Sequence, residues 1–260
     1  MKLVMYFADG FSHEYLEERP FMPDFWDDRR PLTTLLGYSS TIIPAILTGK
    51  WPQDTDMWTE YYLERRPRSA LQRALSRPRL RSLLLPANLL RLVWFRVARV
   101  LGLGLEHRLR IPLELSHLFG RHPMDYEAFP PVGLSVPTLA DLFEEQDLRV
   151  DFRYLRNGGD PAAELDRLAR VADDFDVFFY YDPSLDGRGH KTGASAERLA
   201  PELDRIAGFI ERAWETLRSA DHDVDLLAFS DHGMTTVKRN YDMFHAAGVP
   251  CIYIHSGYYD

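Results

Sequence analysis

Three aspartates in this chain each come soon after a short apolar run, and two of them have a histidine close by in the sequence. These five side chains are Asp9, Asp186, His190, Asp231 and His232. Carboxylate and imidazole groups are the usual protein ligands of zinc and manganese, and two such cations can together stabilise the displacement of a phosphate ester. The residue types and their placement therefore predict a two-metal hydrolytic centre.

The apolar runs are expected to be strands of one sheet. They cover residues 3–7, 177–181 and 226–229, and they are short and continuous, which is typical of parallel strands that are buried on both faces. In an open parallel sheet, ligands bind at the carboxyl ends of the strands. We therefore expect each aspartate to stand at a strand end and all three to converge on one crevice.

Helical patterns alternate with the strand patterns. Helices are expected near residues 137–146, 160–173 and 196–220, and further strands near residues 149–155 and 250–255. Such an alternation predicts an α/β fold, here a mainly parallel sheet with helices on both faces.

A nucleophile is expected just before another helical run. Ser39 and Ser40 precede an apolar stretch that ends at Gly49. A hydroxyl at a helix N-terminus faces backbone N–H groups that attract a phosphoryl group, and a nearby cation can activate that hydroxyl without a histidine base. Either serine satisfies these requirements.

Other motifs of hydrolases and nucleotide-binding proteins are missing from the sequence. There is no Gly-x-Ser-x-Gly element, no phosphate-binding loop with the Gly-Lys-Ser/Thr order and no sulfatase-type Cys/Ser-x-Pro-x-Arg element. The single cysteine, Cys251, excludes an internal disulfide. Two further carboxylates, Asp54 and Asp182, are interpreted as loop residues.

The chain of 260 residues has a net charge of −8, but one segment is strongly basic. Residues 61–110 hold twelve arginines and two glutamates, which gives this segment a charge of +10 and leaves −18 for the rest. A composition so different predicts a separate unit. We expect a single catalytic domain of residues 1–260 that contains an arginine-rich helical cap inserted at residues 53–130.

Two roles are open for the arginine-rich segment. It could bind an anionic lipid or membrane surface or cover an acidic substrate, or its arginines could face solvent or pair with the acidic main domain. The sequence contains no recognised nucleic-acid-binding module. No uncharged stretch reaches the roughly 18 residues that a membrane span needs, and the first apolar run is too short for a secretory signal. A cytoplasmic location is therefore expected.

Taken together, these motifs resemble the alkaline phosphatase superfamily, specifically its type I phosphodiesterase/nucleotide pyrophosphatase branch. The match is spread over the whole chain. It rests on Asp9-Gly10 after the first strand, a hydroxyl nine residues before Thr48-Gly49, Asp186-x-x-Gly189-His190-x-x-Gly193, and Ser230-Asp231-His232-Gly233-Met234. The last two motifs are specific only in combination.

The resemblance implies how the ligands are divided between two divalent cations, zinc or manganese. One cation would be held by Asp9, Asp231, His232 and the nucleophile oxygen, and the other by Asp186, His190 and a further histidine. In relatives this last histidine lies well downstream of the Asp-His-Gly motif, whereas this chain ends 28 residues after His232. Either His255 or His245 takes its place, or the ligand is absent and the catalytic domain is incomplete at its C-terminal end.

The resemblance also indicates which residue is the nucleophile and whether the substrate is a nucleotide. The spacing from Thr48-Gly49 selects Ser39, with Ser40 as the alternative. Relatives that cleave nucleotides then carry Pro-x-x-His-Gly and an asparagine that binds a phosphate oxygen. Here Pro52 is followed by Gln-Asp-Thr-Asp, and Glu60 stands at the position of the asparagine, so a nucleotide substrate does not follow.

These observations predict a metal-dependent phosphohydrolase, specifically a phosphodiesterase in which a serine attacks phosphorus. One alternative is a phosphomonoesterase or phosphotransferase on the same scaffold. Another is a degenerate, non-catalytic binding module that lacks the last metal ligand.

Overall fold

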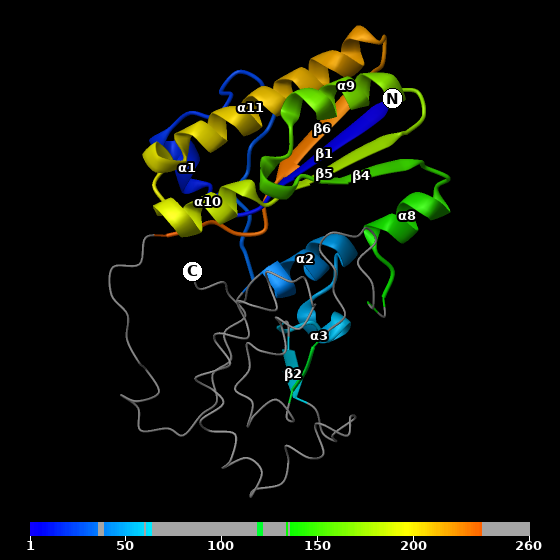
Figure 1. The fold of residues 1–260 in the computed structure, drawn as a ribbon. Coiled ribbons are helices and arrows are strands. Elements are labelled where there is room, and N and C mark those ends of the chain that lie inside the picture. Colours follow the sequence, from blue (N-terminus) through cyan, green and yellow to red (C-terminus); the bar gives the residue numbers. More distant parts are fainter. Residues whose placement is uncertain (36–38, 60, 64–118, 122–133, 135, 236–260) are drawn as a thin grey trace, which may run out of the picture. The chain divides into compact units, whose positions relative to one another are not determined.

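A four-stranded parallel sheet is the main feature of the described part of the chain (Figure 1). The computed structural model of the chain describes residues 1–35, 39–59, 61–63, 119–121, 134 and 136–235. The strands lie in the order β4-β5-β1-β6, and their bounds are Val150–Tyr154 for β4, Val177–Asp182 for β5, Lys2–Ala8 for β1 and Val224–Phe229 for β6.

The register of the strands brings their carboxyl ends to one level. In β1, Ala8 is paired with Asp182 of β5, and Phe7 is paired with Phe229 of β6. The residues that follow β1 and β6 therefore leave the sheet side by side, at the edge where parallel sheets bind ligands.

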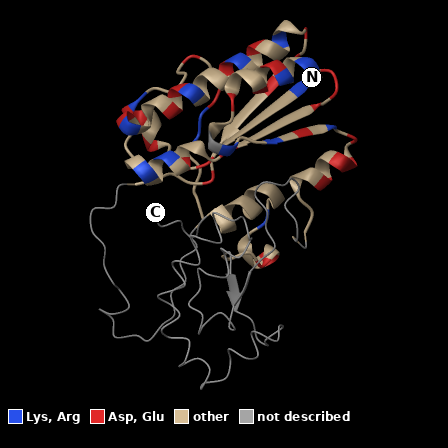
Figure 2. Ribbon diagram, viewed as in Figure 1, with Lys and Arg blue, Asp and Glu red and all other residues tan. Residues whose placement is uncertain are grey.

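One face of the sheet is covered by α9 (Pro161–Val171) and α11 (Ala196–Ser219). Both helices begin with a side-chain cap, since Asp160 accepts from the N–H groups at the start of α9 and Ser195 does so at the start of α11. Their apolar stripes pack on alternate strand residues, whereas charged residues lie along their outer surfaces (Figure 2).

The other face is covered by α2 (Ser39–Thr48) and α8 (Leu139–Glu145). Ile43 and Leu47 of α2 pack in one cluster with Met5, Phe7 and Phe179 of the sheet. Helices thus cover both faces, and the predicted α/β class with a mainly parallel sheet is confirmed.

The remaining short helices in the described part of the chain are α1 (Glu14–Glu18), α3 (Pro52–Thr55), α10 (Ser184–Thr192) and a 3-10 turn at Arg156–Gly158. The structure corrects the interpretation of Asp54 and Asp182 as loop residues. Asp54 lies in α3, and Asp182 is no loop residue, because it ends β5 and its side chain is fully buried against Arg205 and the hydroxyl of Tyr6.

Strand β6 also differs from the prediction of burial on both faces. Within the described part of the chain it pairs with β1 alone, and its side chains alternate, with Asp225 exposed and Leu227 49% exposed. An edge strand with one open face has this alternation.

By its contacts the chain divides into two units, one of residues 1–57, 124–248 and 258–260 and one of residues 58–123 and 249–257. In the second unit, β2 (Tyr61–Leu63) pairs antiparallel with β3 (Phe119–Arg121). Most of the expected cap and the expected strand at 250–255 lie outside the described residues. None of the described helices is long and apolar enough to cross a membrane.

Candidate metal centre

Asp9 is the first residue after β1 and is only 5% exposed. Its Oδ2 accepts a hydrogen bond from the hydroxyl of Tyr181 at 2.8 Å, while its Oδ1 has no hydrogen-bond partner among the described residues. The next residue, Gly10, has a φ of +76°, and a Cβ there would lie 3.0 Å from the Cβ of Asp186. Glycine is therefore needed for Asp9 to approach Asp186 so closely.

Asp231 and His232 follow β6 and face Asp9. Asp231 is buried, its Oδ1 accepts from the N–H of Gly10 at 3.4 Å, and its Oδ2 has no hydrogen-bond partner among the described residues. The Nε2 atom of His232 lies 3.5 Å from the Oδ2 atom of Asp231 and 3.5 Å from the Oδ1 atom of Asp9. Two carboxylate oxygens without partners therefore converge on one imidazole nitrogen.

Hydrogen bonds between two loops fix this arrangement. The N–H of Phe11 donates to Ser230 Oγ at 2.9 Å, and that hydroxyl donates to the carbonyl of His232 at 2.9 Å. Thr34 Oγ1 donates to the carbonyl of Asp231 at 2.8 Å. The loops after β1 and β6 are thus joined by side-chain bonds as well as by the pairing of the strands.

The tautomer of His232 follows from its neighbours. Its Nδ1 lies 3.1 Å from the carbonyl oxygen of Gly233, which can only accept, so Nδ1 carries the proton. In the neutral ring, Nε2 is then an acceptor for the hydroxyl of Ser39, which lies 3.1 Å away. A backbone carbonyl that orients the far nitrogen is the arrangement usual for a metal-binding histidine.

The two candidate nucleophiles have different surroundings. Ser39 is the first residue of α2, and its Oγ reaches Nε2 of His232. Ser40 is buried, and its Oγ has no hydrogen-bond partner among the described residues. The hydroxyl of Ser39 is therefore the one that contacts the carboxylate and imidazole cluster.

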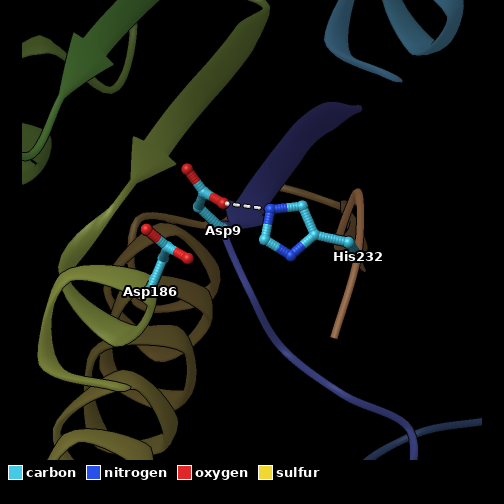
Figure 3. Close-up of side chains that lie close together, drawn as sticks. All are labelled: Asp9, Asp186 and His232. Carbon is cyan, nitrogen blue, oxygen red and sulfur yellow. Dashed lines mark ion pairs between the residues drawn. The ribbon is translucent and has the colours of Figure 1, made fainter. Parts of the chain in front are cut away.

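Asp186 and His190 lie one turn apart on α10, with Nε2 and Oδ1 3.4 Å from each other. Asp186 is thus placed by a helix rather than by a strand end, contrary to the expectation. The sequence did not indicate α10, because Gly187 and Gly189 are poor helix formers. Ligand atoms of Asp9, Asp186 and His232 nevertheless lie within 4.8 Å of one another (Figure 3).

The electrostatics of the cluster favour a bound cation. Burial, together with the charges of Asp231 and Asp186, holds the pKa of Asp9 well above its usual range, although the hydrogen bond from Tyr181 acts in the opposite direction. Burial also raises the pKa of Asp186, against the effect of His190. A divalent cation would offset this repulsion, and the partnerless oxygens of Asp9 and Asp231 are ligands of the right type. The residues therefore fit a divalent metal ion.

The structure brings ligand atoms of three predicted metal ligands, Asp9, Asp186 and His232, together in one group. Of the other two, Asp231 contacts His232 and His190 contacts Asp186. The two histidines considered for the last ligand position, His245 and His255, lie outside the described residues. The sequence reasoning missed Tyr181, which contacts Asp9 directly. Its position at the end of a buried strand gave no signal, because tyrosine is common in strands.

A comparison with known families finds a match. The family model of type I phosphodiesterase / nucleotide pyrophosphatase matches residues 113–249, more than half of the chain. The chain belongs to the type I phosphodiesterase / nucleotide pyrophosphatase family. This confirms the resemblance to that branch of the alkaline phosphatase superfamily. No match is found among curated proteins.

Membership of the type I phosphodiesterase / nucleotide pyrophosphatase family makes the chain a phosphohydrolase that acts on phosphoester bonds. The matched range contains Asp186, His190, Asp231 and His232, whereas Asp9 and Ser39 lie before it. The structure brings residues from both parts to the same edge of the sheet.

Proposed function

We propose that the chain is a metal-dependent phosphodiesterase in which Ser39 attacks phosphorus. The proposal is supported by one observation. Ser39 Oγ lies next to Nε2 of His232, and the partnerless oxygens of Asp9 and Asp231 lie close to the same nitrogen. A hydroxyl that touches a metal-ligand cluster is the arrangement that serine-dependent phosphoryl transfer needs.

Each residue has a proposed role. Asp9, Asp231 and His232 would hold one divalent cation, and Asp186 and His190 the other, with His255 as the proposed further ligand. When bound, zinc or manganese supplies positive charge that stabilises the charge developing on the phosphate oxygens. The carbonyl of Gly233 keeps the proton of His232 on Nδ1, so that Nε2 stays available as a ligand.

The chemical step would begin at the first residue of α2. Ser39 Oγ attacks phosphorus, the bond from phosphorus to the leaving alcohol breaks, and that alcohol departs with the proton that the serine has lost. The serine then carries a phosphate diester that keeps the second ester group, and water cleaves its bond from phosphorus to Ser39 Oγ to release a phosphate monoester and restore the serine. Backbone N–H groups at the start of α2 favour an anionic group at this position. Burial of Asp9 and Asp231 excludes water from the oxygens that would bind the cation.

Paired substrates test the reaction type. The purified chain would be freed of metal by a chelator, supplied with Zn²⁺ or Mn²⁺, and assayed on an aryl phosphate diester and on the matching monoester. We expect faster hydrolysis of the diester, with the monoester as product. Preference for the monoester, or transfer to an added alcohol, would favour a phosphomonoesterase or phosphotransferase on this scaffold. Metal binding without any turnover would favour a non-catalytic binding module.

A further inference from the structure

Among the described residues, the buried hydroxyl of Tyr181 makes a single hydrogen bond, and its acceptor is a proposed metal ligand. Tyr181 is the next-to-last residue of β5 and pairs with Phe7 of β1. Its ring packs on Phe7 with the ring centroids 4.8 Å apart and meets Tyr154 edge-on at 5.4 Å. The ring is therefore held from two sides, and its hydroxyl reaches Asp9 Oδ2 at 2.8 Å.

Because of this hydrogen bond, the two oxygens of the Asp9 carboxylate have different surroundings. Oδ2 is occupied by the tyrosine hydroxyl, which must donate because an ionised carboxylate can only accept. Oδ1 is left 3.5 Å from Nε2 of His232, with no hydrogen-bond partner among the described residues. With one oxygen fixed by a rigid donor, the carboxylate presents its other oxygen to the cluster in one orientation.

We propose that Tyr181 is a positioning residue, whose hydroxyl orients Asp9 as a one-oxygen ligand and so sets the affinity of the centre for its first divalent cation. The inference rests on the proposed function, because it concerns the same centre. Hydrogen-bond partners of metal ligands commonly change metal affinity by about 10- to 100-fold when they are removed.

The neighbouring residue provides a matched control. Tyr180 is also buried, lies in the core cluster on the opposite face of the sheet and packs on Phe209, but its hydroxyl has no hydrogen-bond partner among the described residues. Tyr181→Phe and Tyr180→Phe thus remove the same atom from adjacent buried rings. The first substitution breaks the hydrogen bond to Asp9, and the second breaks no hydrogen bond to any residue that the structure describes.

The test is the dissociation constant for Zn²⁺, measured on the full-length metal-free chain by competition with a chromogenic chelator. Circular dichroism and the Tm of each metal-free variant check the fold. We expect Tyr181→Phe to weaken zinc binding by about 10-fold or more and Tyr180→Phe to leave it within about 2-fold of the wild type. A role in packing alone would change the Tm and leave the affinity of the folded chain unchanged.

Three results would overturn the inference. A folded Tyr181→Phe variant that binds Zn²⁺ as tightly as the wild type would refute it and leave the proposed function standing. An unfolded Tyr181→Phe variant would assign the hydroxyl to the stability of the fold instead. A folded wild-type chain that binds neither Zn²⁺ nor Mn²⁺ would refute the proposed function together with the inference.

Discussion

Ser39 and Ser40 are neighbours in the sequence but differ in what their hydroxyls contact. Ser39 Oγ reaches His232, whereas Ser40 Oγ is buried without a partner among the described residues. Ser39→Ala should lower kcat by at least about a thousandfold, because the attacking oxygen is lost, while the fold and the metal ligands remain. Ser40→Ala should keep near-normal activity, since it removes only an unsatisfied polar group. Steady-state assays on both variants with metal analysis check this, and the reverse pattern would move the nucleophile to Ser40.

The pKa values of Asp9 and Asp186 predict how metal binding depends on pH. Both pKa values are higher in the folded, metal-free chain than in the unfolded chain. The two carboxyl groups therefore stabilise the folded chain at low pH, where they are protonated. This stabilisation is lost as the pH rises through their pKa values in the folded chain. A cation needs both carboxylates ionised and removes the repulsion between them. The increase in Tm on adding zinc should therefore be larger at about pH 7 than at about pH 5. Thermal scans with zinc and with chelator at both pH values measure this increase, and equal increases would contradict the account.

The sequence predicted the site at the scale of single residues better than it predicted the surroundings of those residues. Asp9, Asp231 and His232 were found because strand ends in a parallel sheet converge. The role of Tyr181 depends on the register between β5 and β1, and Asp182 was assigned to a loop although it is fully buried. Contacts of this kind join residues more than 170 positions apart, and no local pattern reports them.

At the scale of elements, one partly buried arginine, Arg205, contacts several of the segments around Asp186. Arg205 of α11 contacts Asp182 at the end of β5 and Glu202 of its own helix, and it donates to Ser184 Oγ at 2.7 Å and to the carbonyl of Gly158 at 3.1 Å. Because α10 begins at Ser184, Arg205 fixes the start of the helix on which Asp186 and His190 lie.

Arg205→Ala should therefore lower the free energy of unfolding by about 3 to 5 kcal/mol, because it leaves the carboxylate of Asp182 buried without its charge partner. Arg212→Ala is the control, since Arg212 is exposed on the same helix and, among the described residues, donates only to the carbonyl of Gly208 within that helix. Its cost should stay near about 0.5 kcal/mol. Urea unfolding measures both values, and equal costs would contradict the role given to Arg205.

The helices that the sequence predicted are those with a long apolar stripe. In α11 the stripe covers the whole length, and the predicted bounds of 196–220 agree closely with Ala196–Ser219. Helix α10 was missed because two of its nine residues are glycines, so its position is fixed by contacts with the rest of the fold. Strand β6 was found, but its open face depends on its place in the sheet, which the run of apolar residues did not reveal.

At the scale of the whole molecule, the charge is divided unevenly, with +10 on residues 61–110 and −18 on the rest. One of the two roles that the sequence leaves open for this segment is binding to an anionic lipid surface. If the segment has that role, the chain should sediment with vesicles rich in phosphatidylserine at about 10 mM salt and be released at about 150 mM salt, because salt screens the attraction. Neutral vesicles are the control. Absence of binding at low salt would favour arginines that face solvent. The cap boundaries and the cytoplasmic location stay predictions.

We propose that a metal centre at the carboxyl edge of the sheet hydrolyses phosphate diesters. A zinc titration of the chelator-treated chain tests it most directly, with diester hydrolysis and bound zinc measured in the same samples. We expect no activity without metal and activity that rises with bound zinc up to about two ions per chain. Full activity in the metal-free chain, or a folded chain that binds no zinc, would contradict it.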